Sequence, residues 1–364
     1  MKKSSQRSWW ILTTEYEPYI IGGLGTAATN LTKHLTRKGV YATVLSKNRY
    51  PRFNVTRRDN LRIIRFPLRK YTPSAIHRWM NKRSYLNPDC IHIHSLQFTD
   101  LAKYFRKKYN TPVIYTCHSL VDLETGPKSQ KRRRINQQVQ LLKVANRIVV
   151  PSRWELAKLK KLYPFCAKKT IIIKHGVNAL TSKTRAPRSR LLFVGRLVPS
   201  KGIEPLLKAI ALLKHKNKKV KLHVIGKGNK IYFRRLKLLV KRLNIQSDVH
   251  WHGFRKQRQV QKLYASYGAV VMPSILEESF GLVALEALAS GVPLIATRSG
   301  GLSEIVNSSV AQVIPKAKSR AIASAIEKMW SNPSITRKRV IAGRKLASRY
   351  RWPRIADQYK KLVK

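Results

Sequence analysis

The segment MPSILEESFGLVALEALASG, residues 272–291, decides how the second half of this chain folds. A β-branched run, Ala269 to Met272, leads into it, and Gly291 ends it before another short apolar run, Pro293 to Ala296. The apolar spacing between them predicts a helix of about three turns, with Glu277 and Glu278 at its positive end. A strand, a helix and a strand in succession indicate a βαβ unit and a parallel sheet.

The same alternation runs through the whole chain in two series, separated by the polar, basic segment Asn178 to Arg190. Its composition is that of a linker, which places a domain boundary near residue 185. The predicted fold class is therefore α/β, with two Rossmann-like, doubly wound domains. Such sheets bind ligands outside the carboxyl ends of their strands, and two facing sheets would enclose a central cleft. The predicted strands are Trp9 to Thr13, Ala42 to Leu45, Ile91 to His94, Val113 to Cys117, Arg147 to Val150, a run from Arg190, Lys219 to Ile225, Val249 to His252, Ala269 to Met272 and Pro293 to Ala296.

Composition narrows the class of protein further. The 364 residues include 75 Lys or Arg and only 16 Asp or Glu, a formal net charge of +59, while 43% apolar residues argue against disorder. Three widely spaced cysteines fit neither a disulfide framework nor a metal pair, so we expect a reducing compartment, the cytoplasm. The N-terminus is interpreted as a first strand, and no apolar run is long enough to span a membrane.

Two glutamates in the quoted segment, Glu278 and Glu286, are eight residues apart. If both were helical, they would share one face, about 12 Å apart along the axis. That spacing exceeds the roughly 5–9.5 Å between the carboxylates of glycosidases and suits two contacts to one extended ligand. The alternatives are helix-dipole compensation for Glu278 and a solvated face for Glu286. Because apolar residues surround Glu286, its carboxylate requires a partner.

Two other patterns suit an anion. Gly22, Gly23 and Gly25 precede a helical pattern from Thr26 to Arg37, and backbone N–H groups at a helix start favour a phosphate. The alternative is an ordinary turn. Arg196 and Lys201 follow the strand that begins at Arg190, and fixed cations at a strand end suit a diphosphate. Because the chain contains 75 Lys and Arg residues, an Arg and a Lys near one another indicate a binding site only when other motifs around them support it.

These motifs together resemble retaining glycosyltransferases of family 4. The order of motifs is that of the family: Gly195-Arg196-Leu197 with Lys201-Gly202, Val224 to Gly228, Trp251-His252-Gly253, Met272-Pro273-Ser274 and Glu278 through Glu286. The N-terminal half is similar through Glu17-Pro18, Gly22 to Gly25, Tyr115 to His118 and Val150-Pro151-Ser152. The family commonly has an acidic residue where Lys227 lies here.

The resemblance implies the GT-B fold. Its N-terminal, acceptor-side domain would span residues 1–185 and its nucleotide-sugar-binding domain residues 186–345. The C-terminal helix, within residues 346–364, would pack back on the first domain, as Trp352 to Leu362 is similar to the family's final helix.

The resemblance also implies roles for single residues. Glu286 would bind the ribose of a nucleotide, Glu278 the hydroxyls of the donor sugar, and Arg196 and Lys201 the diphosphate. Backbone N–H groups of Phe280, Gly281 and Leu282, with those of the glycine turn, would complete the anion cradle. His118 would lie against the transferred sugar; the alternative is a core histidine satisfied by a backbone carbonyl. The catalytic candidates are His118, Arg196, Lys201 and Glu278.

The expected activity is transfer of a hexose from a nucleoside-diphosphate sugar, with a UDP-sugar favoured, to a hydroxyl acceptor that is lipid-linked or a glycan. Retention of configuration is implied by the resemblance alone. The six aspartates include no Asp-x-Asp pair, so we expect no metal and no cofactor besides the donor substrate. The alternatives within the fold are a glycogen- or starch-type glucan synthase and a sugar-nucleotide epimerase. Acceptor contacts are expected in loops such as Tyr50 to Asn60 and Leu120 to Gln130.

The charge has three interpretations. Basic clusters could hold the protein peripherally on an anionic membrane, at its inner face, with Lys128 to Val144 as the candidate contact. A solvated basic surface is the equal alternative. A different class, a nucleic-acid-binding protein, is suggested by Tyr104, Phe105 and Tyr109 among basic residues. Without a recognition module, nucleic-acid binding is expected to be nonspecific.

Overall fold

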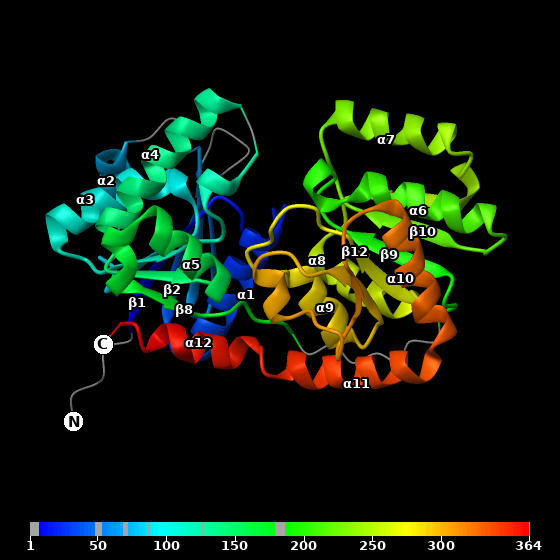
Figure 1. The fold of residues 1–364 in the computed structure, drawn as a ribbon. Helices are drawn as coiled ribbons and strands as arrows, with labels where there is room; N and C mark the ends of the chain where they lie inside the picture. Colours follow the sequence, from blue (N-terminus) through cyan, green and yellow to red (C-terminus); the bar gives the residue numbers. More distant parts are fainter. Residues whose placement is uncertain are drawn as a thin grey trace. The chain divides into compact units, whose positions relative to one another are not determined.

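The computed structural model describes residues 7–47, 53–67, 72–83, 85, 87–125, 127–178 and 186–363. It divides into two compact units (Figure 1), Met1–Gly176 with Trp352–Lys364, and Val177–Arg351. The division therefore falls at Gly176, ahead of the predicted boundary near residue 185, which lies outside the described residues. None of the helices in the described ranges is long and apolar enough to cross a membrane.

The first unit contains a sheet with the strand order β3-β4-β2-β1-β5-β6-β7-β8. Neighbouring strands are parallel except β3, which runs antiparallel to β4. In β1, Trp10 and Leu12 face one core while Trp9 and Ile11 face the other, because successive side chains of a strand alternate. The strands are β1 (Ser8–Thr13), β2 (Tyr41–Lys47), β3 (Asn54–Arg58), β4 (Leu61–Phe66), β5 (Cys90–Ile93), β6 (Val113–Thr116), β7 (Arg147–Val150) and β8 (Thr170–Ile172).

Helices cover both faces of this sheet, as a parallel sheet with two apolar faces requires. The C-terminal helix belongs to this unit, where it packs beside the first helix and buries Trp352 and Tyr359. The helices are α1 (Gly23–Arg37), α2 (Pro73–Asn81), α3 (Thr99–Tyr109), α4 (Lys128–Val144), α5 (Arg153–Leu162) and α12 (Trp352–Lys360).

The second unit contains an entirely parallel sheet with the order β11-β10-β9-β12-β13-β14. Apolar cores lie on both of its faces. Its strands are β9 (Arg190–Val194), β10 (Lys221–Ile225), β11 (Val249–Gly253), β12 (Ala269–Met272), β13 (Leu294–Thr297) and β14 (Gln312–Ile314). Its helices are α6 (Ile203–His215), α7 (Lys230–Arg242), α8 (Gln257–Leu263), α9 (Leu282–Ser290), α10 (Ser319–Ser331) and α11 (Pro333–Ser348).

Each sheet has a point where the chain changes direction across it. In the second unit β9 lies between β10 and β12, and in the first unit β1 lies between β2 and β5. Loops that leave the carboxyl ends of strands on either side of such a point diverge, which opens a crevice for a ligand. Ligand contacts are therefore expected in the loops after β9 and β12, and after β1 and β5.

The predicted strands are confirmed with small shifts at their ends, but the sequence did not predict β3, β4, β8 or β14. The helix of the quoted segment also differs from its prediction. It begins at Leu282 rather than at Glu277, because Gly281 immediately before it has a φ of 99°, outside the right-handed helical region.

Candidate functional site

An ion pair stands at the carboxyl edge of the second sheet. Lys201 Nζ lies 2.5 Å from Glu278 Oε1, and Ser274 Oγ donates a hydrogen bond of 2.6 Å to the same oxygen. Lys201 ends a short 3-10 turn after β9, and the other two residues lie in the loop after β12. The side chains of Lys201 and Glu278 are 23% and 13% exposed, so the pair is partly shielded but remains open to a ligand.

The loops after β9 and β12 are held together by their backbones. The amide of Ile275 donates to the carbonyl of Ser200 at 2.8 Å. Gly202 has a φ of 72°, and a Cβ at this position would lie 1.9 Å from the carbonyl oxygen of Pro273. Only glycine therefore fits this close approach. The approach explains how a lysine and a glutamate 77 residues apart form a pair.

Glu286 is buried on α9, only 7% exposed. Its carboxylate accepts hydrogen bonds from Gln257 Nε2 at 2.8 Å and from the Tyr264 hydroxyl at 3.0 Å. Burial raises the pKa of Glu286, and these hydrogen bonds oppose that rise because they favour the charged form. The partner that its apolar neighbours required is thus an amide and a phenol. The sequence pattern contained no signal for either.

The predicted geometry of the two glutamates is wrong. Glu278 is not helical: it forms a bridge with Gly300, and its carbonyl accepts from the amide of Gly301 at 2.7 Å. The shared helix face and the separation of about 12 Å therefore do not apply. The backbone leaves the helical region at Gly281, so Glu278 belongs to the loop after β12 while Glu286 belongs to the helix.

The remaining donor-site candidates in this unit are distributed around the start of α9 and the end of β9. Gly281 is the N-cap and Leu282 the first residue of α9, which places their N–H groups at the positive end of the helix. The Phe280 side chain is buried and packs against Tyr350, so only its backbone could serve an anion. Arg196 is exposed, and within the described ranges no hydrogen bond or ion pair involves its guanidinium.

In the first unit, α1 begins at Gly23 rather than at the predicted Thr26, so the glycines form the helix start itself, and an acidic side chain occupies it. Glu15 Oε2 accepts from the amides of Ile21 and Gly22 at 2.9 and 3.0 Å. A Cβ on Gly25 would lie 2.7 Å from the Glu15 Cβ and 2.8 Å from its Oε2. The glycine at 25 is therefore required by the approach of Glu15, and one of the expected anion-binding residues, Gly22, already donates its amide to a carboxylate. Sequence reasoning on Gly22, Gly23 and Gly25 missed Glu15.

His118 belongs to a cluster of histidines at the carboxyl edge of the first sheet. His118 Nε2 and His94 Nδ1 are 2.9 Å apart, and the rings of His118 and His175 stack at 5.2 Å. Burial and the neighbouring imidazoles hold the pKa of His118 well below its usual value, and burial lowers the pKa of His175 to about 4. The histidine is therefore neutral at physiological pH. Its partner is another histidine rather than the backbone carbonyl of the alternative interpretation.

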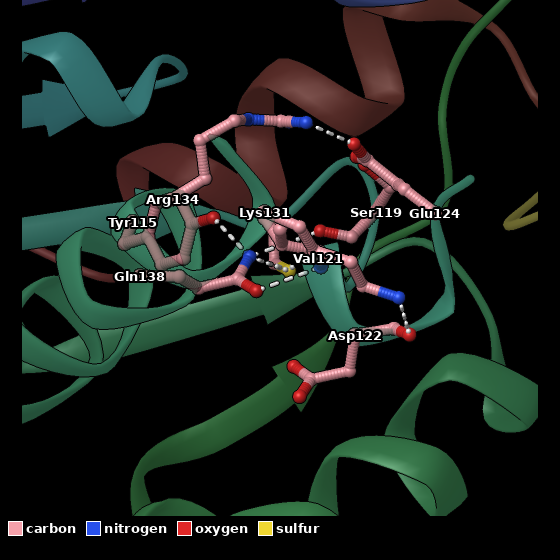
Figure 2. Close-up of polar contacts among 9 residues, drawn as sticks. Tyr115, Ser119, Val121, Asp122, Glu124, Lys131, Arg134 and Gln138 are labelled. Atoms are coloured by element: carbon pink, nitrogen blue, oxygen red, sulfur yellow. Dashed lines mark hydrogen bonds and ion pairs between the residues drawn. The ribbon is translucent and has the colours of Figure 1, made fainter. Parts of the chain in front are cut away.

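The loop that follows His118 is clamped by α4 (Figure 2). The buried amide of Gln138 accepts from the Val121 amide at 2.9 Å and donates to the Ser119 carbonyl at 3.0 Å and the Tyr115 hydroxyl at 2.9 Å. A second tie joins the Arg134 guanidinium to Glu124, which also accepts from the Ser119 hydroxyl. Gln138 alone thus bonds both to the strand before His118, through Tyr115, and to the loop after it, through Ser119 and Val121.

Replacing Gln138 with leucine is expected to lower the free energy of unfolding by about 1–3 kcal/mol, because the buried backbone amide of Val121 loses its acceptor. Urea titration of the purified variant measures the loss. Gln140→Leu is the matched control on the same helix, since Gln140 is exposed and, within the described ranges, bonds only to the exposed Lys103. Equal stability of the two variants would contradict the clamp.

The predicted acceptor loops are only partly described. Residues 50–52 of the first and residue 126 of the second lie outside the described ranges. Among the residues that are described, no group of three or more His, Cys, Asp or Glu side chains is placed to hold a metal ion.

Comparison with known proteins identifies the family. Residues 21–179 match the family model "Glycosyltransferase Family 4", and residues 181–346 match "Glycosyl transferases group 1". The chain is 30% identical over 293 residues to the D-inositol 3-phosphate glycosyltransferase of Pseudarthrobacter chlorophenolicus, an alignment that covers 74% of this chain and 68% of the relative. The chain belongs to the family 4 glycosyltransferases.

Other relatives of this glycosyltransferase agree. It is 29% identical to the D-inositol 3-phosphate glycosyltransferase of an Arthrobacter species, with 72% of this chain and 66% of that protein covered. An uncharacterized glycosyltransferase of Methanocaldococcus jannaschii is 26% identical, and the alignment covers 96% of this chain and 95% of that protein. The chain spans about two thirds of the length of the first of these relatives and nearly all of the second.

Solved structures show that the fold is GT-B. A sucrose-phosphate synthase from Thermosynechococcus elongatus superposes with a TM-score of 0.82, at 23% identity and 98% coverage of both chains. The Anabaena protein Alr3699/HepE, solved in complex with UDP and glucose, superposes with a TM-score of 0.80, at 17% identity and 98% coverage of both chains. The predicted fold class, two Rossmann-like domains of the GT-B type, is confirmed.

Proposed function

We propose that this glycosyltransferase moves a hexose from a nucleoside diphosphate, with UDP favoured, to a hydroxyl acceptor. The observation that carries the proposal is the ion pair of Lys201 and Glu278 in the loops after β9 and β12 of the second sheet. A cation and a carboxylate held side by side offer opposite chemistries to one ligand, since the ammonium attracts phosphate and the carboxylate accepts from sugar hydroxyls.

Each residue has a role in this proposal. Lys201 and the exposed Arg196 bind the diphosphate, and Lys201 stabilises the negative charge that develops on it as it leaves. Glu278 binds the hydroxyls of the donor sugar, and Glu286 binds the ribose. Amides at the start of α9 contribute further donors to the phosphates. These cations take the part of a divalent ion, so transfer is proposed to need no metal.

His118 is proposed to contact the transferred sugar as a neutral hydrogen-bonding group, in agreement with its lowered pKa. Membership of the family supports transfer with retention of anomeric configuration. The preference for UDP is supported by the Anabaena protein of the same fold, solved with UDP and with UDP-glucose.

The test is a donor screen with the purified chain. UDP-, ADP- and GDP-hexoses are offered with a panel of hydroxyl acceptors, with and without EDTA, and nucleotide release is measured. We expect release from a UDP-sugar that EDTA does not abolish, and NMR of the product should show the donor's anomeric configuration. A lengthening α-glucan would instead indicate a glucan synthase, and a free epimer of the sugar an epimerase. Release from none of the donors would contradict the proposal.

A further inference from the structure

Helix α7 of the second unit has two apolar stripes where a surface helix needs one. Tyr232, Leu236 and Val240 are buried against the core. On the other side, Ile231 is 83% exposed and Leu238 is 59% exposed. These two residues are seven positions apart, so they lie on the same face of the helix, two turns from one another. Single exposed apolar residues need no explanation, but two aligned on one helix form a surface.

Cations flank this outer stripe. Arg234, Arg235, Lys241 and Arg242 are exposed, and at 100° per residue all lie within about 80° of Ile231. Lys230 and Lys237 add to the charge, and residues 230–242 contain no Asp or Glu. Among the described residues Arg235 pairs with Glu204, at 3.4 Å, and no ion pair involves the others. Figure 1 shows α7 at the edge of its unit, beside α6.

We propose that the outer face of α7, formed by Ile231, Leu238 and the four flanking cations, docks on an anionic lipid bilayer. The aliphatic side chains enter the boundary between headgroups and acyl chains, and the cations contact lipid phosphates. A helix with an aliphatic stripe between basic residues is complementary to this surface in both respects. The inference does not depend on the proposed glycosyl transfer.

Other occupants fit the face less well. Nucleic acid would satisfy the cations, but single strands gain from stacking on aromatic rings, and here Tyr232 is buried while Phe233 packs against Trp251. A second copy of the chain, which carries the same net charge of +59, would set its own cations against those of this face. Nucleic acid would therefore leave the aliphatic side chains without a partner, and a second copy of the chain would leave the cations without one.

The membrane contact expected from the sequence, Lys128 to Val144, lacks the apolar part of such a surface. In α4, Leu141 and Leu142 are buried and Val139 packs against the core. Ile135 is only half-buried, and no large hydrophobic side chain among the described residues of α4 is exposed. This helix offers charge to the solvent but no aliphatic stripe. The sequence of α4 shows which of its residues are apolar, but only the fold shows that these residues are turned toward the core.

Sedimentation of the full chain with vesicles tests the proposal. The vesicles contain either phosphatidylcholine alone or about one third phosphatidylserine, at ionic strengths of about 0.1 and 0.5 M. The key variant is Ile231→Ser/Leu238→Ser. Its control is Ile335→Ser/Ile341→Ser on α11, where the two isoleucines are 48% and 64% exposed. Both double variants keep the charge of the chain unchanged.

We expect the α7 variant to lower partitioning onto the anionic vesicles about tenfold or more, and most clearly at the higher salt, where charge is screened. The control should bind as the wild type does. Circular dichroism and thermal melting establish that both variants are folded. Equal loss in the two variants, or unchanged binding in the α7 variant, would overturn the proposal. So would a loss confined to binding of an RNA oligomer measured in parallel.

Discussion

Lys201→Ala is expected to lower turnover by about 10²–10³-fold, the effect of removing one preorganised group that stabilises developing charge. The ammonium is held 2.5 Å from the Glu278 carboxylate, in a loop pinned to the next by Gly202, so its position is fixed before a ligand binds. Nucleotide release with the donor from the screen measures the loss. Lys201→Arg, which keeps the charge but not the compact shape, should retain part of the rate.

The control for Lys201→Ala is Lys208→Ala. Lys208 is an exposed residue of α6, the helix that follows Lys201, and no hydrogen bond or ion pair among the described residues involves its side chain. It should keep wild-type turnover. Because the alanine also leaves Glu278 without its cation, urea titration of Lys201→Ala is needed alongside the rates. Wild-type turnover in Lys201→Ala would refute the role of the ion pair.

Glu286→Gln is expected to weaken UDP binding by about 10- to 100-fold. Hydrogen bonds to a charged group contribute about 1.5–3 kcal/mol, and an amide is a poorer acceptor for two ribose hydroxyls. Isothermal titration calorimetry with UDP measures the change. Glu327→Gln on α10 is the control, because its carboxylate pairs with Lys216 at the surface. An unchanged affinity for UDP in Glu286→Gln would exclude the ribose contact.

The same variant has a signature in stability that does not depend on any ligand. Burial raises the pKa of Glu286, so between its ordinary value and its raised value the folded chain binds more protons than the unfolded chain. The contribution of this residue to the free energy of unfolding is therefore present at low pH and is lost as the pH rises through that window. Glu286→Gln removes this dependence. Its stability relative to the wild type should be higher at about pH 7 than at about pH 5.

The edge strand β3 could not be predicted from the sequence, and the reason is physical. The hairpin of β3 and β4 turns at Asp59, whose φ is 32°, and β3 is an exposed edge strand rich in polar residues. An edge strand buries little, so its sequence shows no apolar run to predict it. The central strand β1 is buried on both faces and therefore consists mostly of apolar residues. This continuous apolar run made the strand predictable from the sequence.

The site shows the same division. The residue types at positions 196, 201, 278 and 286 were identified from motif order, but Gln257 and Tyr264, the hydrogen-bond partners of Glu286, were not. A hydrogen bond between residues distant in the chain leaves no local pattern. Glu15 was missed for a related reason: the glycines after it suggested an external anion, whereas the anion bound there is the Glu15 carboxylate, from six and seven residues earlier in the chain.

The sequence by itself determined the two βα series, the excess of cations and the family, because strand and helix periodicity and motif order are local properties of the chain. The tertiary structure alone decided that Glu278 lies in a loop beside Lys201, that Glu15 fills the glycine turn, and that α7 rather than α4 exposes aliphatic side chains. Each of these depends on which distant segments meet when two sheets are wound, and packing, not composition, sets which face of a helix remains in water.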